Sequence, residues 1–109
     1  MAKSVVIVGG LVRDPELSYT KGGTAVTNFS LGSKKVFSSD GAEGESDYWN
    51  CVVFGKQAEN LANYKKKGEM LEVAGYDELQ KWDGKDGKTQ SKVVTIADRI
   101  VWLPGSKKE

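Results

Sequence analysis

Residues 56–68 read KQAENLANYKKKG, and they show the clearest helical periodicity in the chain. One face of this segment carries residues three and four apart, namely Ala58, Leu61, Ala62 and the stem of Lys65. Tyr64 lies beside that face, and we assign it to the core. The lysines at 65–67 favour the carbonyl end of a helix dipole, and Gly68 is placed to cap it. The pattern predicts one helix over residues 56–67.

On both sides of this helix the sequence is typical of β-strands separated by turns. Three strand-like segments precede the helix and two follow it: residues 3–12, 25–37, 47–54, 69–82 and 89–103. The first segment is apolar at odd and at even positions, which predicts that both faces of the strand are covered. Gly9-Gly10 favours a bend of the kind that closes barrels. In the second, Ala25, Phe29 and Leu31 share the parity that we expect to face the core. This order predicts an all-β OB-fold, a five-stranded partly open Greek-key barrel with the helix between strands three and four.

The composition limits the class of protein. A chain of 109 residues suits one domain, and thirteen glycines with two prolines are typical of a fold with many turns. No run approaches the roughly 20 apolar residues of a membrane span, and the first residues show no signal peptide, so we expect a cytosolic protein. Cys51 is the only cysteine and histidine is absent. We therefore expect no enzyme, no cofactor and no metal site.

Aromatic and basic residues accompany one another on the strands and at their tips. Tyr48 and Phe54 are six residues apart on one strand, so they share a face and are separated by roughly 20 Å. Phe37 follows Lys34 and Lys35, and Trp82 stands at a glycine-bearing hairpin tip with nearby lysines at Lys81, Lys85 and Lys88. Exposed rings stack on bases of any kind while cations follow the phosphates. The pattern predicts sequence-independent binding of single-stranded nucleic acid.

Several observations favour plainer interpretations. The net charge of +1 is lower than a nucleic-acid binder usually carries. Phe54 could be core, and Phe37 could close the end of the barrel. Tyr48 and Trp49 are adjacent, so they face opposite ways and we expect one of them to be packed. Trp102, between two apolar neighbours, fits the core or an interface between subunits.

Three segments, in this order, resemble the bacterial-type single-stranded DNA-binding protein (SSB) family: RDPELSY at 13–19, GTAVTNFSL at 23–31 and VVFGKQAEN at 52–60. The resemblance extends over about residues 3 to 103. It implies a homotetramer around which single-stranded DNA wraps during replication, repair and recombination. It implies stacking by Phe37, Tyr48, Phe54 and Trp82. It implies basic contacts near Lys3, Arg13, Lys34, Lys35, Lys56, Lys67 and Lys81.

Two features depart from the family pattern. Asp77 and Glu78 precede Trp82 where members usually place arginines, and carboxylates facing the DNA would repel phosphate. We assign residues 1–104 to the binding domain and 105–109 to a short extension, because the acidic tail of the family is absent. Recruitment of partner enzymes through that tail is therefore not expected. Whether the gene belongs to a cell, a plasmid or a phage stays open.

Two other functions compete with DNA coating. A related OB-fold scaffold, such as a primosome-type subunit, would bind DNA weakly, and the acidic pair and small net charge favour it. A hydrolytic or nucleotide-modifying enzyme would need a catalytic base, a metal cluster or a phosphate loop, none of which the sequence offers.

Overall fold

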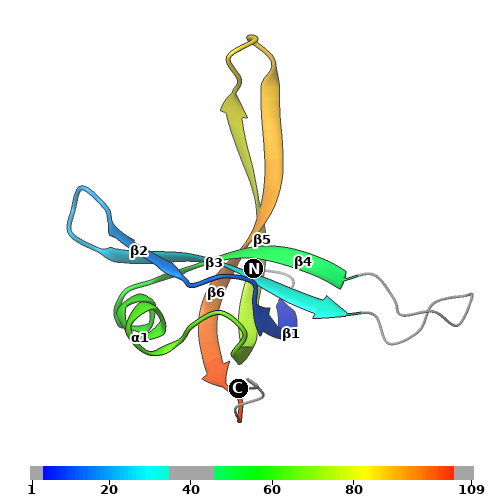
Figure 1. The fold of residues 1–109 in the computed structure, drawn as a ribbon. Helices are drawn as coiled ribbons and strands as arrows, with labels where there is room; N and C mark the ends of the chain where they lie inside the picture. The colour runs from blue at the N-terminus through cyan, green and yellow to red at the C-terminus, as the bar shows by residue number, and fades with distance from the viewer. Residues whose placement is uncertain (1–3, 35–45, 105–109) are drawn as a thin grey trace, which may run out of the picture.

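The computed structural model describes residues 4–34 and 46–104. Its elements are β1 (Val5–Leu11), β2 (Glu16–Tyr19), β3 (Ala25–Lys34), β4 (Ser46–Phe54), α1 (Lys56–Tyr64), β5 (Met70–Asp83) and β6 (Thr89–Trp102) (Figure 1). The strands form one curled sheet in the order β1-β5-β6-β4-β3-β2, and β1 also pairs with β3. A partly closed sheet with one helix between β4 and β5 confirms the predicted OB-fold.

The sheet closes where β1 changes partner. Residues Val5 to Gly10 pair with β5, and then Gly10 and Leu11 pair with Gly32 and Leu31 of β3. The two strands approach so closely that a Cβ at Gly9 would lie 2.7 Å from the Gly32 carbonyl oxygen. Only glycine fits this crossing, which agrees with the bend predicted at Gly9-Gly10.

The barrel interior is filled by alternate residues of the strands. Ala25, Phe29 and Leu31 are buried as predicted, and they join a core cluster with Leu71 and Val73. Successive side chains of a strand point to opposite faces, so the other parity of β3 lies outside the barrel. The fold thus leaves parts of this outer face accessible, among them Asn28.

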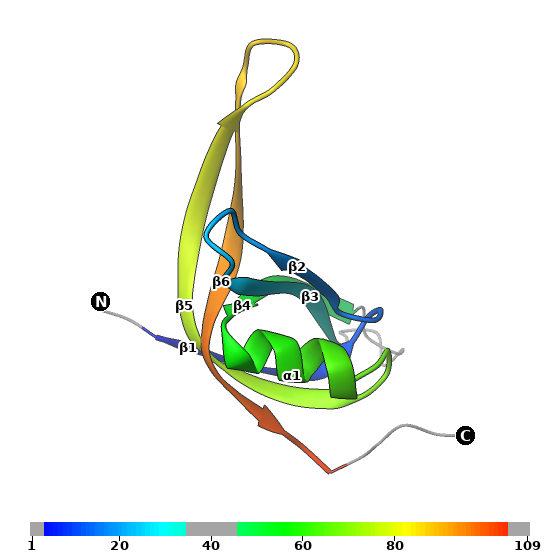
Figure 2. The same ribbon diagram turned by 90° about the vertical axis from the view of Figure 1, so that its left-hand side faces the viewer.

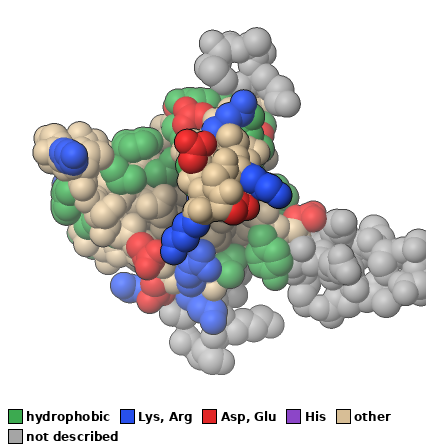
Figure 3. All heavy atoms as spheres, turned by 90° about the horizontal axis from the view of Figure 1, so that it is seen from above, with side chains coloured by type: hydrophobic (Ala, Val, Ile, Leu, Met, Phe, Trp, Pro, Cys, Tyr) green, Lys and Arg blue, Asp and Glu red, His purple; other side chains and the backbone are tan. Residues whose placement is uncertain are grey.

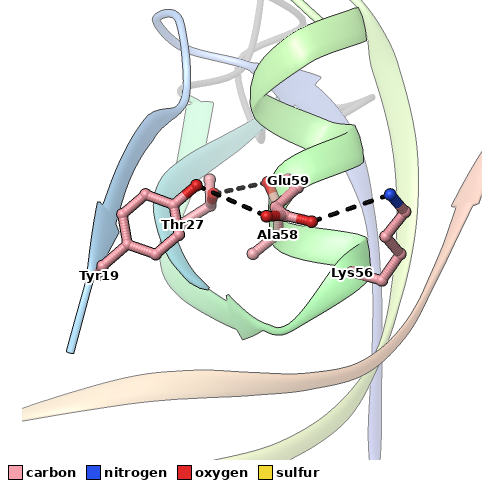
Figure 4. A network of polar contacts seen from close by, with 5 residues as sticks. All are labelled: Tyr19, Thr27, Lys56, Ala58 and Glu59. Atoms are coloured by element: carbon pink, nitrogen blue, oxygen red, sulfur yellow. Dashed lines mark hydrogen bonds and ion pairs between the residues drawn. The ribbon is translucent and has the colours of Figure 1, made fainter. Parts of the chain in front are cut away.

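Helix α1 covers one opening of the barrel (Figure 2). Its residues Ala58 and Leu61 are fully buried. The Thr27 hydroxyl donates a hydrogen bond of 2.7 Å to the Ala58 carbonyl oxygen, and Figure 4 shows Glu59 lying between the Tyr19 hydroxyl and the Lys56 ammonium group. The contacts from Tyr19 and Thr27 fasten the helix to β2 and β3, in addition to the apolar packing.

The end of the helix differs from the prediction. Tyr64 is its last residue, and Lys65 already has extended backbone, with φ −117° and ψ 142°. The following turn is fastened elsewhere, because the Gly68 N–H donates to the Leu11 carbonyl oxygen at 2.8 Å. The assignment of Tyr64 to the core is wrong: it is 66% exposed. The Tyr64 ring lies at the end of the helix, beside the exposed Trp102 ring at a centroid distance of 6.1 Å and outside the core cluster.

Two further features differ near the N-terminus. Residues 16–19 form an additional short strand, β2, which pairs with β3 although all its side chains are exposed. An edge strand of this kind is held by backbone hydrogen bonds. Its sequence therefore needs no alternation of apolar and polar residues, and the strand was not predicted. The expectation that β1 is covered on both faces is wrong for the single chain, because Val6 is 63% and Val8 46% exposed.

Strands β5 and β6 continue together well beyond the barrel (Figures 1 and 2). We call residues 76–96 the arm. Their pairing runs without interruption from Tyr76–Ile96 to Asp83–Thr89. From Asp77 outward most side chains of the arm are exposed. The arm places its side chains beside the outer face of β3 and β4.

Candidate nucleic-acid interface

The outer face of β4 presents a row of alternate residues: Tyr48, Asn50, Val52 and Phe54. Tyr48 is 65% and Phe54 45% exposed, so neither ring belongs to the core. Tyr48 lies over Gly32 on the neighbouring strand, where a larger residue would meet the ring. Trp49 points inward and packs against the core cluster. This confirms that one of the adjacent pair is packed, and it identifies Tyr48 as the free ring.

One face of the arm looks toward this row. It consists of Tyr76, Glu78 and Gln80 on β5, paired with Ile96, Val94 and Lys92 on β6. Trp82 shares their parity and extends the face toward the tip. The Trp82 ring is 47% exposed, and the Lys92 ammonium lies 5.9 Å from its centroid, within the range of a cation–π contact. An aromatic surface and a cation therefore stand together on the arm.

A groove with a cavity volume of about 340 Å³ separates the arm from the outer face of β3 and β4. A small apolar cluster of Val52, Val94 and Ile96, with Val26 and Tyr76 packed against it, lies at this junction. Polar side chains also line the groove, among them Arg13, Asn28, Asn50, Gln80 and Lys92. An apolar surface surrounded by hydrogen-bonding groups suits a ligand with flat apolar faces and polar edges, as a nucleobase has.

The charges around the groove are mixed, as the view along the arm in Figure 3 also shows. Arg13 and Lys92 line the groove together with Glu16 and Glu78. Asp77 has the opposite parity and accepts a hydrogen bond of 2.9 Å from the Thr95 hydroxyl. Of the acidic pair Asp77 and Glu78, only Glu78 therefore faces the groove.

Cys51 lies beneath the groove, with its side chain inside the barrel. Burial, and secondarily the charge of Asp77, raises the pKa of its thiol to about 12. The protonated thiol is a weak nucleophile and a poor metal ligand. Among the described residues, no group of three or more His, Cys, Asp or Glu is placed to hold a metal ion.

Comparison with known proteins agrees with this geometry. Residues 2–103 match the single-strand binding protein family. The chain belongs to that family. A single-stranded DNA-binding protein of Oceanobacillus iheyensis is 44% identical over 103 residues, which cover 94% of this chain and 64% of the relative. The corresponding protein of Halalkalibacterium halodurans is 44% identical, with 94% and 61% covered, and that of Clostridium tetani 41%, with 96% and 72% covered. The chain thus spans less than two thirds of the first two relatives.

In this member of the single-strand binding protein family, three of the four predicted stacking rings are described and all are exposed: Tyr48, Phe54 and Trp82. Phe54 lines the groove, Trp82 extends its arm side, and Tyr48 lies further along β4. Phe37, Lys3 and Lys35 lie outside the described residues, and only the backbone of Lys34 is described.

The predicted phosphate contacts are spread over several surfaces. Arg13 lines the groove, whereas Lys85 and Lys88 are exposed near the tip of the arm. Lys81 has the opposite parity to Trp82 and faces away from the groove. Lys56 is highly exposed, at 3.9 Å from Glu59. Lys67 lies in the turn after the helix, where its N–H donates to the Asp14 carboxylate at 2.8 Å.

The groove residues that the sequence interpretation did not single out for binding include Asn28, Asn50, Tyr76 and Lys92. Their parity is a usable signal, because Asn50 shares that of Phe54 and Tyr76 that of Trp82. Asn28 likewise has the parity opposite to Phe29 and Leu31, whereas the place of Lys92 follows from its pairing with Gln80 on the other strand of the arm. Register across strands is a tertiary property.

Trp102 belongs to a different surface of the molecule. It is 44% exposed, which excludes the core, and its ring centroid lies 6.1 Å from that of Tyr64. The Lys65 ammonium lies 4.7 Å from the Trp102 ring.

No helix within the described part of the chain has the length and apolar character needed to cross a membrane.

Proposed function

We propose that this chain binds single-stranded DNA without sequence preference, by stacking bases on exposed rings and contacting phosphates with basic side chains. The observation that carries this proposal is the placement of Phe54 and Trp82 on the β4 row and the arm that flank the groove, with Tyr48 further along the row. Each stacked base contributes roughly 1–3 kcal/mol, and every base has a π-face to offer. Phe37, Lys3, Lys34 and Lys35 complete the proposed set.

The proposed role is the coating and protection of unpaired DNA during replication, repair and recombination. It is supported by the family to which the chain belongs and by the names of its bacterial relatives. Binding of this kind needs neither catalysis nor a cofactor. We place it in the bacterial cytoplasm, whether the gene is cellular or carried by a phage or plasmid. Residues 1–104 form the proposed binding domain.

We also infer that the chain assembles with copies of itself. Among residues 4–34 and 46–104, the exposed apolar side chains include two pairs: Val6 and Val8 on β1, and the cross-strand pair Leu79 and Val93, each 56% exposed, on the arm. Burying such surface yields about 25 cal/mol per Å². The number four rests on the family resemblance. Light scattering should give four times the 11.9 kDa of one chain, and Val6→Glu should lower that mass.

A scaffold that binds DNA weakly is the second candidate. Glu78 and Glu16 in the groove favour it, because two carboxylates there offset Arg13 and Lys92. The scaffold hypothesis predicts that the rings of the groove remain exposed but that the protein binds DNA with low affinity. Protein contacts would then dominate its function.

Titration with dT oligomers of increasing length separates the two candidates. Stacking on Trp82 should quench tryptophan fluorescence, and the logarithm of the affinity should fall with the logarithm of salt concentration by about 0.7 for each phosphate contact. Phe54→Ala should weaken binding by roughly 1–3 kcal/mol and leave thermal unfolding almost unchanged. Weak binding with little quenching would favour the scaffold, and loss of folding in Phe54→Ala would return that ring to the core.

A further inference from the structure

Three side chains form a hydrogen-bonded chain at the wall of the groove. The Arg13 guanidinium donates to Ser30 Oγ at 3.4 Å, and Ser30 Oγ lies 3.0 Å from Asn50 Oδ1. Arginine has donors and no acceptor, so Ser30 must accept from Arg13 and is left with its single proton for Asn50. The carbonyl end of the Asn50 amide is therefore held by Ser30, and its NH₂ group is left for the groove.

The surroundings keep this arrangement in place. Ser30 is 7% exposed, and it lies directly opposite Asn50 in the β3–β4 ladder. The Val12 N–H donates to the Ser30 carbonyl oxygen at 3.0 Å, which holds the residue before Arg13 against β3. Arg13 and Asn50 are themselves exposed and line the groove. The cluster thus offers the groove hydrogen-bond donors with a net positive charge.

The position of the cluster indicates what these donors meet. Asn50 stands between Tyr48 and Phe54 on one face of β4, roughly 7 Å from the first and 13 Å from the second along the strand. A single strand that stacks on both rings must carry its sugar–phosphate backbone past this point. Bases present donors as well as acceptors at their edges, whereas a phosphodiester presents acceptors and negative charge.

We propose that Arg13 and Asn50 form a phosphodiester-binding subsite between the two rings, with Ser30 as its positioning residue. The proposal rests on the single-stranded DNA binding proposed above and adds to it two residues, Ser30 and Asn50. Hydrogen bonds to an ionised group are about twice as strong as those between neutral groups. An uncharged amide can therefore matter as much as an exposed lysine.

Substitutions at Asn50 and Ser30 test the subsite with dT oligomers. Asn50→Ala should weaken binding about tenfold, and Asn50→Asp, which places a carboxylate at the phosphate, by about a hundredfold. Ser30→Ala frees the amide and should weaken binding about threefold, whereas Ser30→Thr keeps the hydroxyl and should restore most of the affinity. Asn63→Asp, the same charge change on the exposed side of α1, is the matched control and should have little effect. Thermal unfolding of each variant checks that the substitution has not caused a loss of folding.

Two readouts separate phosphate binding from other roles. The loss caused by Asn50→Ala should be equal on dT and dA oligomers, and it should leave the salt slope unchanged, whereas Arg13→Gln should lower the slope by about 0.7. Oligomers with neutral methylphosphonate linkages should bind wild type and Asn50→Ala alike. A loss that depends on the base would overturn the proposal in favour of base-edge reading. Unchanged affinity in Asn50→Asp would also overturn it. If the wild type fails to bind dT at all, the proposed function fails instead.

Discussion

The β5–β6 ladder has two halves that share strands and hydrogen-bond pattern but differ in their relation to the core. In the barrel half, Leu71 and Val73 are fully buried and Ala97 is nearly so. In the arm, Leu79 and Trp82 stand in solvent. A register shift at Ala74/Gly75 separates the halves, and a Cβ at Gly75 would overlap the Ile96 carbonyl oxygen.

The difference indicates how one β-hairpin can divide folding stability and the proposed DNA binding between separate segments. Backbone pairing alone gives a marginally stable ribbon, so the barrel half must supply the burial that holds the arm in place. The arm in turn is free to expose rings and charges that a core would not tolerate. Substitutions in the barrel half should therefore change folding, and those in the arm should change binding.

The largest effect is expected from a matched pair of leucines. Leu71→Ala should lower the free energy of unfolding by about 2–5 kcal/mol, because it opens a cavity in the core. Leu79→Ala on the arm should change it by less than about 0.5 kcal/mol in the single chain, and any further loss in the assembled protein would report the subunit contact proposed above. Urea unfolding followed by circular dichroism measures both. Similar losses in the two variants would show that the arm is part of the cooperative core, or is buried in an assembly.

A pair of tryptophans tests the binding side of the comparison. Trp82→Ala should weaken single-stranded DNA binding by roughly 1–3 kcal/mol with little change in melting temperature. Trp102→Ala, which removes an equally exposed ring outside the groove, should leave the affinity nearly intact. Fluorescence anisotropy with a labelled dT oligomer gives both values. Equal losses would mean that DNA contacts both surfaces.

Cys51 lies where the two halves meet, and its pKa of about 12 predicts a pH effect. Below its ordinary pKa the thiol is protonated in both states and has no effect on this pH dependence. Above that value the unfolded chain loses the proton while the folded chain keeps it, so stability falls as the pH rises toward 12. Between pH 8 and 10, wild type should lose roughly 1.4–1.9 kcal/mol relative to Cys51→Ala. Parallel curves for the two proteins would mean that water reaches the thiol.

The smallest effect is expected at the carboxylate of the groove. Glu78→Gln removes a negative charge near the DNA path and should strengthen binding by roughly 0.5 kcal/mol at low salt. The effect should fade as salt is added, because exposed charges are screened. Asp77→Asn, on the opposite face, is the control for the same change of charge. A greater gain in Asp77→Asn would mean that DNA follows the other side of the arm.

Much of the fold could be predicted from local patterns, and the exceptions have physical causes. The alternation of apolar and polar residues identified Ala25, Phe29 and Leu31 as core, because in a half-buried strand every second side chain points to the core. The short strand β2 shows no such alternation in its sequence, since its side chains are all exposed and its pairing with β3 uses backbone groups. The assignment of Tyr64 to the core failed because its ring lies at the end of the helix against the exposed Trp102, a contact between distant residues that no local pattern predicts.

The candidate site could be predicted only in part. Tyr48, Phe54 and Trp82 stand out in the sequence because large rings beside turns and lysines are poorly explained as core. Lys92 and Ser30 do not stand out. The place of Lys92 depends on pairing across the arm, and Ser30 is buried on the outer face by contacts with Arg13 and Asn50.

The sequence by itself determined the class of fold, the order of its elements and the kind of chemistry, since hydrophobic period, turn residues and aromatic content are local properties. Only the tertiary structure decided which charges and amides share the groove, that Glu78 faces it while Asp77 does not, and that Ser30 holds the side-chain oxygen of Asn50. Those outcomes depend on strand register and on hydrogen bonds between residues distant in the chain, and no local pattern encodes them.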